Sequence, residues 1–292
     1  MQTLKQKRRR LREHIVYFLI YAAAFISVFL LVGIIAYVFL RGVRCINWSF
    51  LTTVPSARKG TVGIAGNIVN TLYVVVLTLL IATPIGIGAA IYLNEYAKPG
   101  KIVRLIELTT EILSGIPSII FGLFGMVFFG MTLGFGYSIL TGSLTLSIMI
   151  LPLITRNTQE ALKTVPESYR SGALGIGATK WYMIRTILLP SAMPGIITGV
   201  ILAIGRIVGE SAALLFTAGS GYLLPKAATG LGGWLHKILE SGGTLTIQLY
   251  LSMSKAQYDT AFGIAVVLLI IVLLINFLTK YLAGRLDVHN RE

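Results

Sequence analysis

The sequence predicts an all-α membrane protein, built as a polytopic bundle of six transmembrane helices. Of its 292 residues, 55% are hydrophobic and 12% are charged, and the mean hydropathy is +0.81. Soluble domains carry about 25% charged residues. Six segments have the run of about 20 apolar residues that a helix needs to cross a bilayer. These segments lie at about residues 15–40, 69–93, 111–133, 137–155, 191–217 and 261–283.

The first apolar segment is interpreted as a retained helix. Six Lys and Arg residues precede it, as in a signal peptide, but the apolar run from Ile15 to Leu40 exceeds the roughly 7–15 residues of a signal peptide. No small-residue cleavage site follows it. We therefore divide the chain into residues 1–66 (basic cytoplasmic N-terminus, first helix and outer linker), 67–283 (transmembrane core) and 284–292 (cytoplasmic tail).

Two features should shape the third span, and the fourth span is unusual in its length. Pro117 is expected to kink the third span, because neighbouring helices can satisfy the carbonyl that a proline leaves free. Glu107 and Glu111 are placed at the cytoplasmic start of this span, where the helix dipole favours carboxylates, so we expect them to cap it. The fourth span is short and is bounded by Gly136 and Arg156.

The distribution of positive charge predicts the orientation. Seventeen Lys and Arg residues fall in the segments assigned to the inner side and seven in the outer loops. Because cytoplasmic loops are enriched in these residues, both termini are expected to be cytoplasmic. The net charge of +14 lies in short clusters between apolar spans and forms no continuous basic stripe, which argues against nucleic acid as a partner.

The sequence carries few residues of the types that enzymes and metal sites use. Cys45 is the single cysteine, and the three histidines show no metal-ligand spacing. No G-x-x-x-x-G-K-[ST] motif occurs, so ATP binding by a P-loop is excluded. Neither H-E-x-x-H nor a nucleophile elbow is present. We expect a protein that is not an enzyme and binds no cofactor.

The inner loop from Arg156 to Pro190 is amphipathic. Pro166 suits a first helical turn, and a short helix is expected to run to about Leu174. Gly175 and Gly177 would permit a reversal. Thr179 would then cap a second helix, which Pro190 is expected to end. Two interpretations stay open, a rigid knob that transmits force and an amphipathic loop that rests on the membrane surface.

Arg206 and Glu210 are charged residues inside the fifth span. A charge at such depth costs about 2.5–3.5 kcal/mol on insertion scales, so it faces protein or water and often serves function. The i,i+4 spacing would let the two side chains pair. They could line an anion path, since a guanidinium can donate two parallel hydrogen bonds to an oxyanion, or merely neutralise each other. Arg156, at the inner mouth of the fourth span, could meet an exiting anion.

Two further patterns have two interpretations each. Small residues recur at every fourth position of the fifth span, which favours close helix packing within the chain or with another subunit. They are Gly195, Gly199 and Ala203, and then Gly205, Gly209 and Ala213. The outer loop from Ala218 to Thr260 contains Trp234 and should form two short helices. It could meet an external binding protein, or its aromatic residues could lie in the membrane interface.

The inner loop resembles the coupling loop of ABC-importer permeases, E-A-A-x3-G-x9-I-x-L-P. Gly177, Ile187, Leu189 and Pro190 match this pattern in register. The three E-A-A positions fall on Ser171, Gly172 and Ala173, of which only the alanine matches. The resemblance extends from about Asn67 to Phe277. The segments 90–97 (AIYLNEYA), 115–125 (GIPSIIFGLFG) and 201–210 (ILAIGRIVGE) are similar to phosphate-importer permeases of the PstA type.

This resemblance implies a type I ABC-importer permease fold and translocation of phosphate across the prokaryotic inner membrane by alternating access. The implied partners are a dimer of ATP-binding subunits, a PstC-type second permease, an external phosphate-binding protein and the lipid bilayer. The residues implied in ATPase coupling are Ser171, Gly172, Ala173, Gly175, Gly177, Ile187, Leu189 and Pro190. The alternatives are a permease for another oxyanion, such as molybdate or sulfate, and a stand-alone anion channel or carrier.

Overall fold

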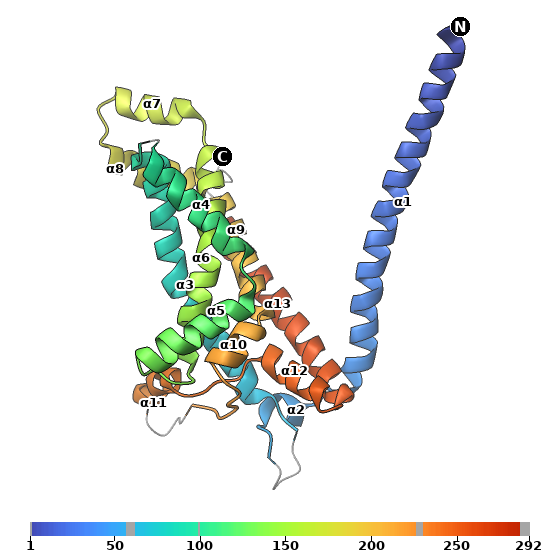
Figure 1. Cartoon of the computed structure of the whole chain (residues 1–292), viewed down its shortest axis with the longest axis vertical. Coiled ribbons are helices and arrows are strands. Elements are labelled where there is room, and N and C mark those ends of the chain that lie inside the picture. The colour runs from blue at the N-terminus through green and yellow to red at the C-terminus, as the bar shows by residue number, and fades with distance from the viewer. Residues whose placement is uncertain (1, 57–61, 99, 226–229, 287–292) are drawn as a thin grey trace.

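The computed structural model describes residues 2–56, 62–98, 100–225 and 230–286, and these are mostly helical (Figure 1). In this part of the chain, five helices are long and apolar enough to cross a membrane. A bent pair of shorter helices makes a sixth crossing if it is counted as one span. The five are Glu13–Cys45, Ala65–Tyr96, Ile139–Lys163, Lys180–Gly209 and Tyr258–Tyr281. The predicted all-helical bundle is confirmed, and its six spans are reached when the bent pair is counted as one.

In the described residues, five long helices are separated by one to three shorter ones. The long helices are α1 (Gln2–Gly42), α3 (Ala65–Ile91), α6 (Ile139–Lys163), α9 (Leu189–Gly209) and α13 (Tyr258–Leu286). The shorter α-helices are α2 (Trp48–Thr52), α4 (Lys101–Gly115), α5 (Ser118–Gly125), α7 (Glu167–Gly175), α8 (Lys180–Met183), α10 (Ala212–Thr217), α11 (Gly230–His236) and α12 (Leu245–Ser254). Three π-helical turns follow α3, α5 and α8, namely η2 (Tyr92–Tyr96), η3 (Met126–Thr132) and η4 (Ile184–Leu188).

The two ends of the helical chain lie at the same end of the molecule. Figure 1 shows the start of α1 and the end of α13 on the side that carries α7 and α8, with α11, α12 and α2 at the opposite end. An even number of crossings produces this arrangement when α4 and α5 count as one bent span. We call these two ends the α7 end and the α12 end.

Helix α6 lies in the centre of the bundle and packs against α3 and α9. Small residues let the backbones approach, as expected for helices in lipid. A Cβ added at Gly195 would lie 2.6 Å from the Cβ of Ala161, and one added at Gly199 would lie 2.7 Å from the Cβ of Asn157. The first series of small residues therefore packs within the chain. Gly205 of the second series has open space where a side chain would stand.

Helix α1 lies apart from the bundle along most of its length (Figure 1). It meets α13 near the α12 end, where the rings of Tyr37 and Phe262 are 5.7 Å apart in an edge-to-face arrangement. Gly42 allows this approach, because a Cβ there would lie within 3 Å of the Phe262 backbone. The large apolar side chains of α1 remain exposed, so lipid or another membrane subunit must cover them.

The third span is broken, whereas the sequence predicted a kink. Helices α4 and α5 meet at an angle of 101°. Proline disfavours the helical conformation of the residue before it, and Ile116 is indeed extended, with φ −71° and ψ 131°. The predicted capping role of Glu107 and Glu111 is wrong, because α4 begins at Lys101 and places both residues well beyond its first turn.

The fourth and fifth spans also differ from their expected limits. Helix α6 begins after Ser138, whose Oγ accepts a hydrogen bond from the Thr141 amide, and it continues to Lys163. Arg156 therefore lies inside a helix and not in a loop at its mouth. The fifth span ends at Gly209, and α10 is a separate short helix.

Polar side chains at the start of α3 hold the outer segment in place. The amide nitrogen of Asn70 donates to the carbonyls of Gly221 and Gly243, at 2.9 and 3.2 Å. Helices α11 and α12 are the two short helices expected in this segment.

Lys237 is fully buried and pairs with Glu240 at 3.3 Å. Although partial burial raises the pKa of Glu240, the hydrogen bonds and charges of Lys237 and His236 lower it overall.

The topology can be tested with single cysteines in a Cys45→Ala background. Ser168 is exposed on α7 and Lys255 is exposed after α12, at opposite ends of the bundle. The charge distribution predicts that α7 is cytoplasmic, so a membrane-impermeant maleimide added to intact cells should label Lys255→Cys and leave Ser168→Cys unlabelled. Both should react after permeabilisation. Labelling of Ser168→Cys in intact cells would contradict this orientation.

Candidate functional site

The segment between α6 and α9 forms a helix, a reversal and a second helix, as the sequence predicted. Helix α7 follows Pro166 and ends at Gly175. Gly177 has φ +86°, a conformation that side chains with a Cβ rarely adopt. The Ala178 amide donates to the Ala173 carbonyl at 3.1 Å and closes the turn. Thr179 then caps α8, since its hydroxyl accepts from the Tyr182 amide at 3.3 Å.

Pro190 does not end the second helix, which corrects the sequence prediction. Helix α8 passes through the π-helical turn η4 directly into α9, so that residues 180–209 form one apolar span. Pro190 lies in the first turn of α9. A proline has no amide hydrogen to donate. At this position, directly after the change from η4 to α9, the helix needs no amide donor. The reversal is thereby joined to the fifth span without a flexible linker.

One side of this segment is anchored by its own small apolar core. Ala173, Met183, Ile184 and Leu188 are buried together with residues of α6 and α9. Of the residues that the sequence linked to coupling, Ile187, Leu189 and Pro190 are partly buried on this side. Those that are exposed are Ser171, Gly172, Gly175 and Gly177.

The other side presents apolar and aromatic groups. Ile176, at the tip of the reversal, is 87% exposed. Leu174, Trp181, Tyr182 and Tyr169 are each between 42% and 59% exposed. An apolar patch of this kind on a folded segment indicates a contact surface for protein or membrane. We call residues 166–183 the knob.

A buried ion pair fixes the knob to the end of α3. The guanidinium of Arg170 lies 3.2 Å from the carboxylate of Glu95 in η2, and the two side chains are 14% and 5% exposed. Arg170 also donates to the carbonyls of Leu162 and Val165, at 2.9 and 3.0 Å. Lys180 donates to the Glu95 carbonyl. Sequence reasoning missed this cluster because Glu95 and Arg170 are 75 residues apart, and nothing local marks either as buried.

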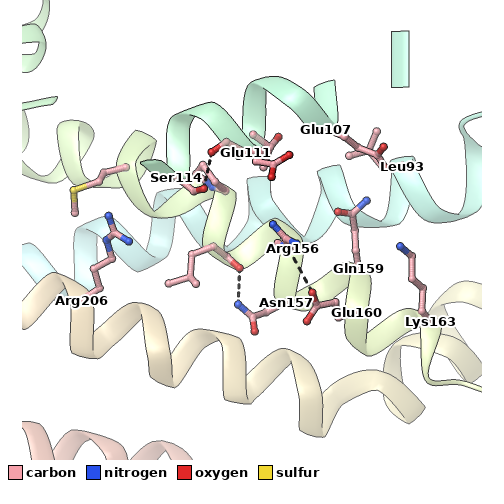
Figure 2. A pocket seen from close by; sticks show the side chains of 14 residues that line it. Leu93, Glu107, Glu111, Ser114, Arg156, Asn157, Gln159, Glu160, Lys163 and Arg206 are labelled. Atoms are coloured by element: carbon pink, nitrogen blue, oxygen red, sulfur yellow. Dashed lines mark hydrogen bonds and ion pairs between the residues drawn. The ribbon is translucent and has the colours of Figure 1, made fainter. Parts of the chain in front are cut away.

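A charged cavity of about 360 Å³ lies between α4, α6 and α9 (Figure 2). Three of its lining residues are cations (Arg156, Lys163 and Arg206) and three are carboxylates (Glu107, Glu111 and Glu160). The remaining lining residues are Leu93, Thr110, Ser114, Met149, Pro152, Leu153, Asn157 and Gln159. The cavity brings together two of the three residues predicted for an anion path, Arg206 and Arg156.

Arg156 and Arg206 differ in their partners. The Arg156 guanidinium lies 3.5 Å from the Glu160 carboxylate, and both side chains are 66% exposed. Exposed pairs of this kind are weak, so the Arg156 guanidinium remains available. Arg206 makes no ion pair or hydrogen bond within the described residues.

The expected pair between Arg206 and Glu210 does not form. Helix α9 ends at Gly209, and Glu210 is extended, so the helical i,i+4 geometry is lost between them. The carboxylate of Glu210 instead accepts from the Ala213 amide at 3.0 Å, and its carbonyl accepts from the Thr246 hydroxyl at 2.8 Å. Glu210 is not among the lining residues of the cavity.

Comparison with known proteins agrees with this architecture. Residues 82–291 match the family described as binding-protein-dependent transport system inner membrane component. The chain belongs to this family. It is therefore an inner-membrane transport component, and the knob and the cavity are its two candidate functional regions.

Individual relatives support the same assignment. The chain is 41% identical over 190 residues to the probable ABC transporter permease protein YqgI of Bacillus subtilis, an alignment that covers 65% of each chain. It is 34% identical over 242 residues to the phosphate transport system permease protein PstA of Xylella fastidiosa, which covers 82% of this chain and 80% of that protein.

Two solved transporters share the fold. A bacterial alginate ABC transporter, in complex with its alginate-bound periplasmic protein, superposes with a TM-score of 0.67 at 17% identity, over 93% of this chain and 96% of that one. Inward-facing MetNI, a methionine ABC transporter, gives a TM-score of 0.56 at 20% identity, over 77% and 94% of the two chains. These likenesses confirm the type I permease fold.

The anchor of the knob can be tested by removing one charge. Arg170→Gln should leave the Glu95 carboxylate buried and unpaired, a loss on the order of 3 kcal/mol. Hydrogen exchange across residues 167–183 of the purified protein should then accelerate by about a hundredfold. The matched control is Arg185→Gln, since Arg185 is exposed. The double variant Glu95→Gln, Arg170→Gln should recover much of the protection, because no buried charge remains. Equal exchange in both single variants would contradict the anchoring role.

Proposed function

We propose that this chain is the PstA-type permease subunit of an ABC importer that moves phosphate into the cell. Relatives named as phosphate transport permeases support the substrate, and the knob supports coupling to a separate ATPase. The observation that carries most weight is that residues 166–183 form a folded, apolar-tipped projection joined to the fifth span.

The knob would convert closure of an ATPase dimer into movement of the bundle. Its anchored side and the ion pair of Glu95 with Arg170 would prevent it from yielding under load. The continuous run from Lys180 to Gly209 would carry displacement toward Arg206. A ligand or partner shifts a conformational equilibrium only through different contacts in two states, and a rigid projection provides such contacts.

Other partners would occupy the remaining exposed surfaces. A PstC-type permease would cover α1 and the open face around Gly205 and Gly209. An external phosphate-binding protein would dock at the α12 end. The α7 end and both termini would be cytoplasmic, which follows the distribution of Lys and Arg. The division into residues 1–66, 67–283 and 284–292 is part of this proposal.

Phosphate would pass through the charged cavity. Arg206 lies inside the fifth span without a carboxylate partner among the described residues, and Arg156 projects from α6 into the same space (Figure 2). Guanidinium groups suit tetrahedral oxyanions because their planar fork donates two hydrogen bonds. Glu210, whose carboxylate accepts from the Ala213 amide and does not line the cavity, would make no contact with the anion in this path.

Reconstitution tests the proposal as a whole. Proteoliposomes should take up phosphate only when both permeases, the ATPase and the binding protein are present together with ATP. Uptake that persists without the ATPase would instead favour a channel or carrier. Uptake of sulfate or molybdate with their own binding proteins, and none of phosphate, would favour the other oxyanion importers.

Gly177 should be required for coupling because of its backbone conformation. Ala at φ +86° costs about 1–2 kcal/mol, and a side chain would meet no atom there, so Gly177→Ala isolates the backbone effect. We expect lower ATPase co-purification and lower transport with normal membrane insertion. Gly134 is a matched control, since it has φ +76°, equally open surroundings and a position far from the knob. Equal losses in Gly177→Ala and Gly134→Ala would reduce the effect to general destabilisation.

Arg206 should be required for uptake because of its positive charge and because its planar guanidinium can donate two hydrogen bonds at once. Arg206→Gln should lower phosphate uptake by more than tenfold, and Arg206→Lys should give an intermediate rate, because lysine keeps the charge without the bidentate geometry. Glu210→Gln should transport nearly normally, since its amide oxygen can still accept from the Ala213 amide. Subunit abundance and ATPase binding must be measured in each variant. Normal uptake by assembled Arg206→Gln complexes would reject the anion path.

A further inference from the structure

Helix α4 turns a polar face toward the charged cavity. Glu107, Thr110, Glu111 and Ser114 all line the cavity, and their i, i+3, i+4, i+7 spacing places them along one side of the helix. The opposite side carries the apolar residues Ile102, Leu105, Leu108 and Ile112, which are 53–75% exposed. No residue of α4 is buried in the bundle. The helix is thus built to border a wet cavity on one side and lipid or a neighbouring subunit on the other.

The carboxylates of α4 lie across the cavity from the arginines. Figure 2 shows Glu107 and Glu111 on α4, facing the space into which Arg156 and Arg206 project from α6 and α9. Neither carboxylate forms an ion pair or a hydrogen bond within the described residues. Glu111 is one helical turn closer than Glu107 to Ser114 and to the break after Gly115.

Unpaired carboxylates in an anion path need an explanation, because they repel any anion. Hydrogen phosphate differs here from sulfate and molybdate. At neutral pH it keeps at least one hydroxyl, whereas the other two tetrahedral oxyanions have only acceptor oxygens. An ionised carboxylate only accepts hydrogen bonds. It can therefore bind the hydroxyl of hydrogen phosphate, but facing sulfate it is left with repulsion and an unmade hydrogen bond.

We propose that Glu111, assisted by Glu107, selects protonated tetrahedral oxyanions within the permease itself. Arg206 and Arg156 donate to the unprotonated oxygens of the anion, while a carboxylate of α4 accepts the hydrogen bond of its hydroxyl. The cavity of about 360 Å³ has room for such an ion between the two sets of groups. This inference rests on the proposed anion path and adds a second selection step after the external binding protein.

The test measures anion binding in the cavity without the binding protein. The parent is the assembled transporter with Cys45→Ala and Thr110→Cys, so that the reporter thiol lies between the two carboxylates on the polar face of α4. Phosphate uptake by this complex is measured first and is the reference for every variant below. A neutral maleimide then modifies Thr110→Cys in the presence of increasing phosphate, arsenate, sulfate or molybdate. Arsenate keeps a hydroxyl as phosphate does, which makes it the matched anion.

Phosphate and arsenate should slow the modification at concentrations about tenfold lower than sulfate and molybdate require. In the double variant Glu107→Gln, Glu111→Gln, the four anions should slow the modification at concentrations within about twofold of one another. The reason is that an amide both donates and accepts hydrogen bonds. Asp259→Asn is the matched control for loss of negative charge, since Asp259 lies in the first turn of α13 at the α12 end. It should keep the tenfold difference.

The outcomes separate this inference from the proposed function. If sulfate protects the parent as well as phosphate does, or if the difference survives in Glu107→Gln, Glu111→Gln, the selection role is overturned while the anion path stands. If no anion protects the parent, or if Arg206→Gln leaves protection unchanged, the cavity is not the anion path and both proposals fail.

Discussion

The hydrocarbon core of a membrane offers no water to polar groups, and this constraint governs where the chain places its charges. Backbone amides and carbonyls must be paired within the spanning segments, so continuous helices cross and interruptions occur where protein or a water-filled cavity surrounds them. The break between α4 and α5 and the end of α9 at Gly209 are two such interruptions. Glu111 lies about one turn before the break after Gly115, Arg206 lies about one turn before the end of α9, and both line the cavity. The charged lining and the interrupted helices therefore meet the same requirement.

The proposed coupling depends on how firmly the knob is held to the bundle. A projection that transmits force must not unfold at its base, and the base of this one is held by the buried pair of Glu95 with Arg170 and by the core around Ile184 and Leu188. Buried pairs of this kind are costly to break from one side. Because η4 leads directly into α9, the knob and the fifth span are joined without an intervening loop. The proposed path residue Arg206 lies near the other end of that span.

The physical character of each feature decided whether the sequence could predict it. Apolar length is a local property, so the spans near residues 15–40, 69–93 and 261–283 were identified closely. Turn chemistry is local as well, and Pro166, Gly177 and Thr179 gave the reversal of the knob nearly to the residue. The limits of α4 and α6 were missed because both helices continue as amphipathic segments beyond the apolar run, and the hydropathy signal ends before the helix does.

The sequence by itself determined that the chain lies in lipid, that it is helical, roughly where its spans lie and which backbone conformation Gly177 needs. All of these follow from composition or from neighbouring residues. Only the tertiary structure decided which charges meet. It separated Arg206 from Glu210 by ending α9 between them, and it joined Arg206 with Arg156 in one cavity. It also turned Glu107 and Glu111 toward that cavity and brought Glu95 to Arg170. Such pairings depend on how distant helices pack, and spacing along one helix contains no information about its neighbours.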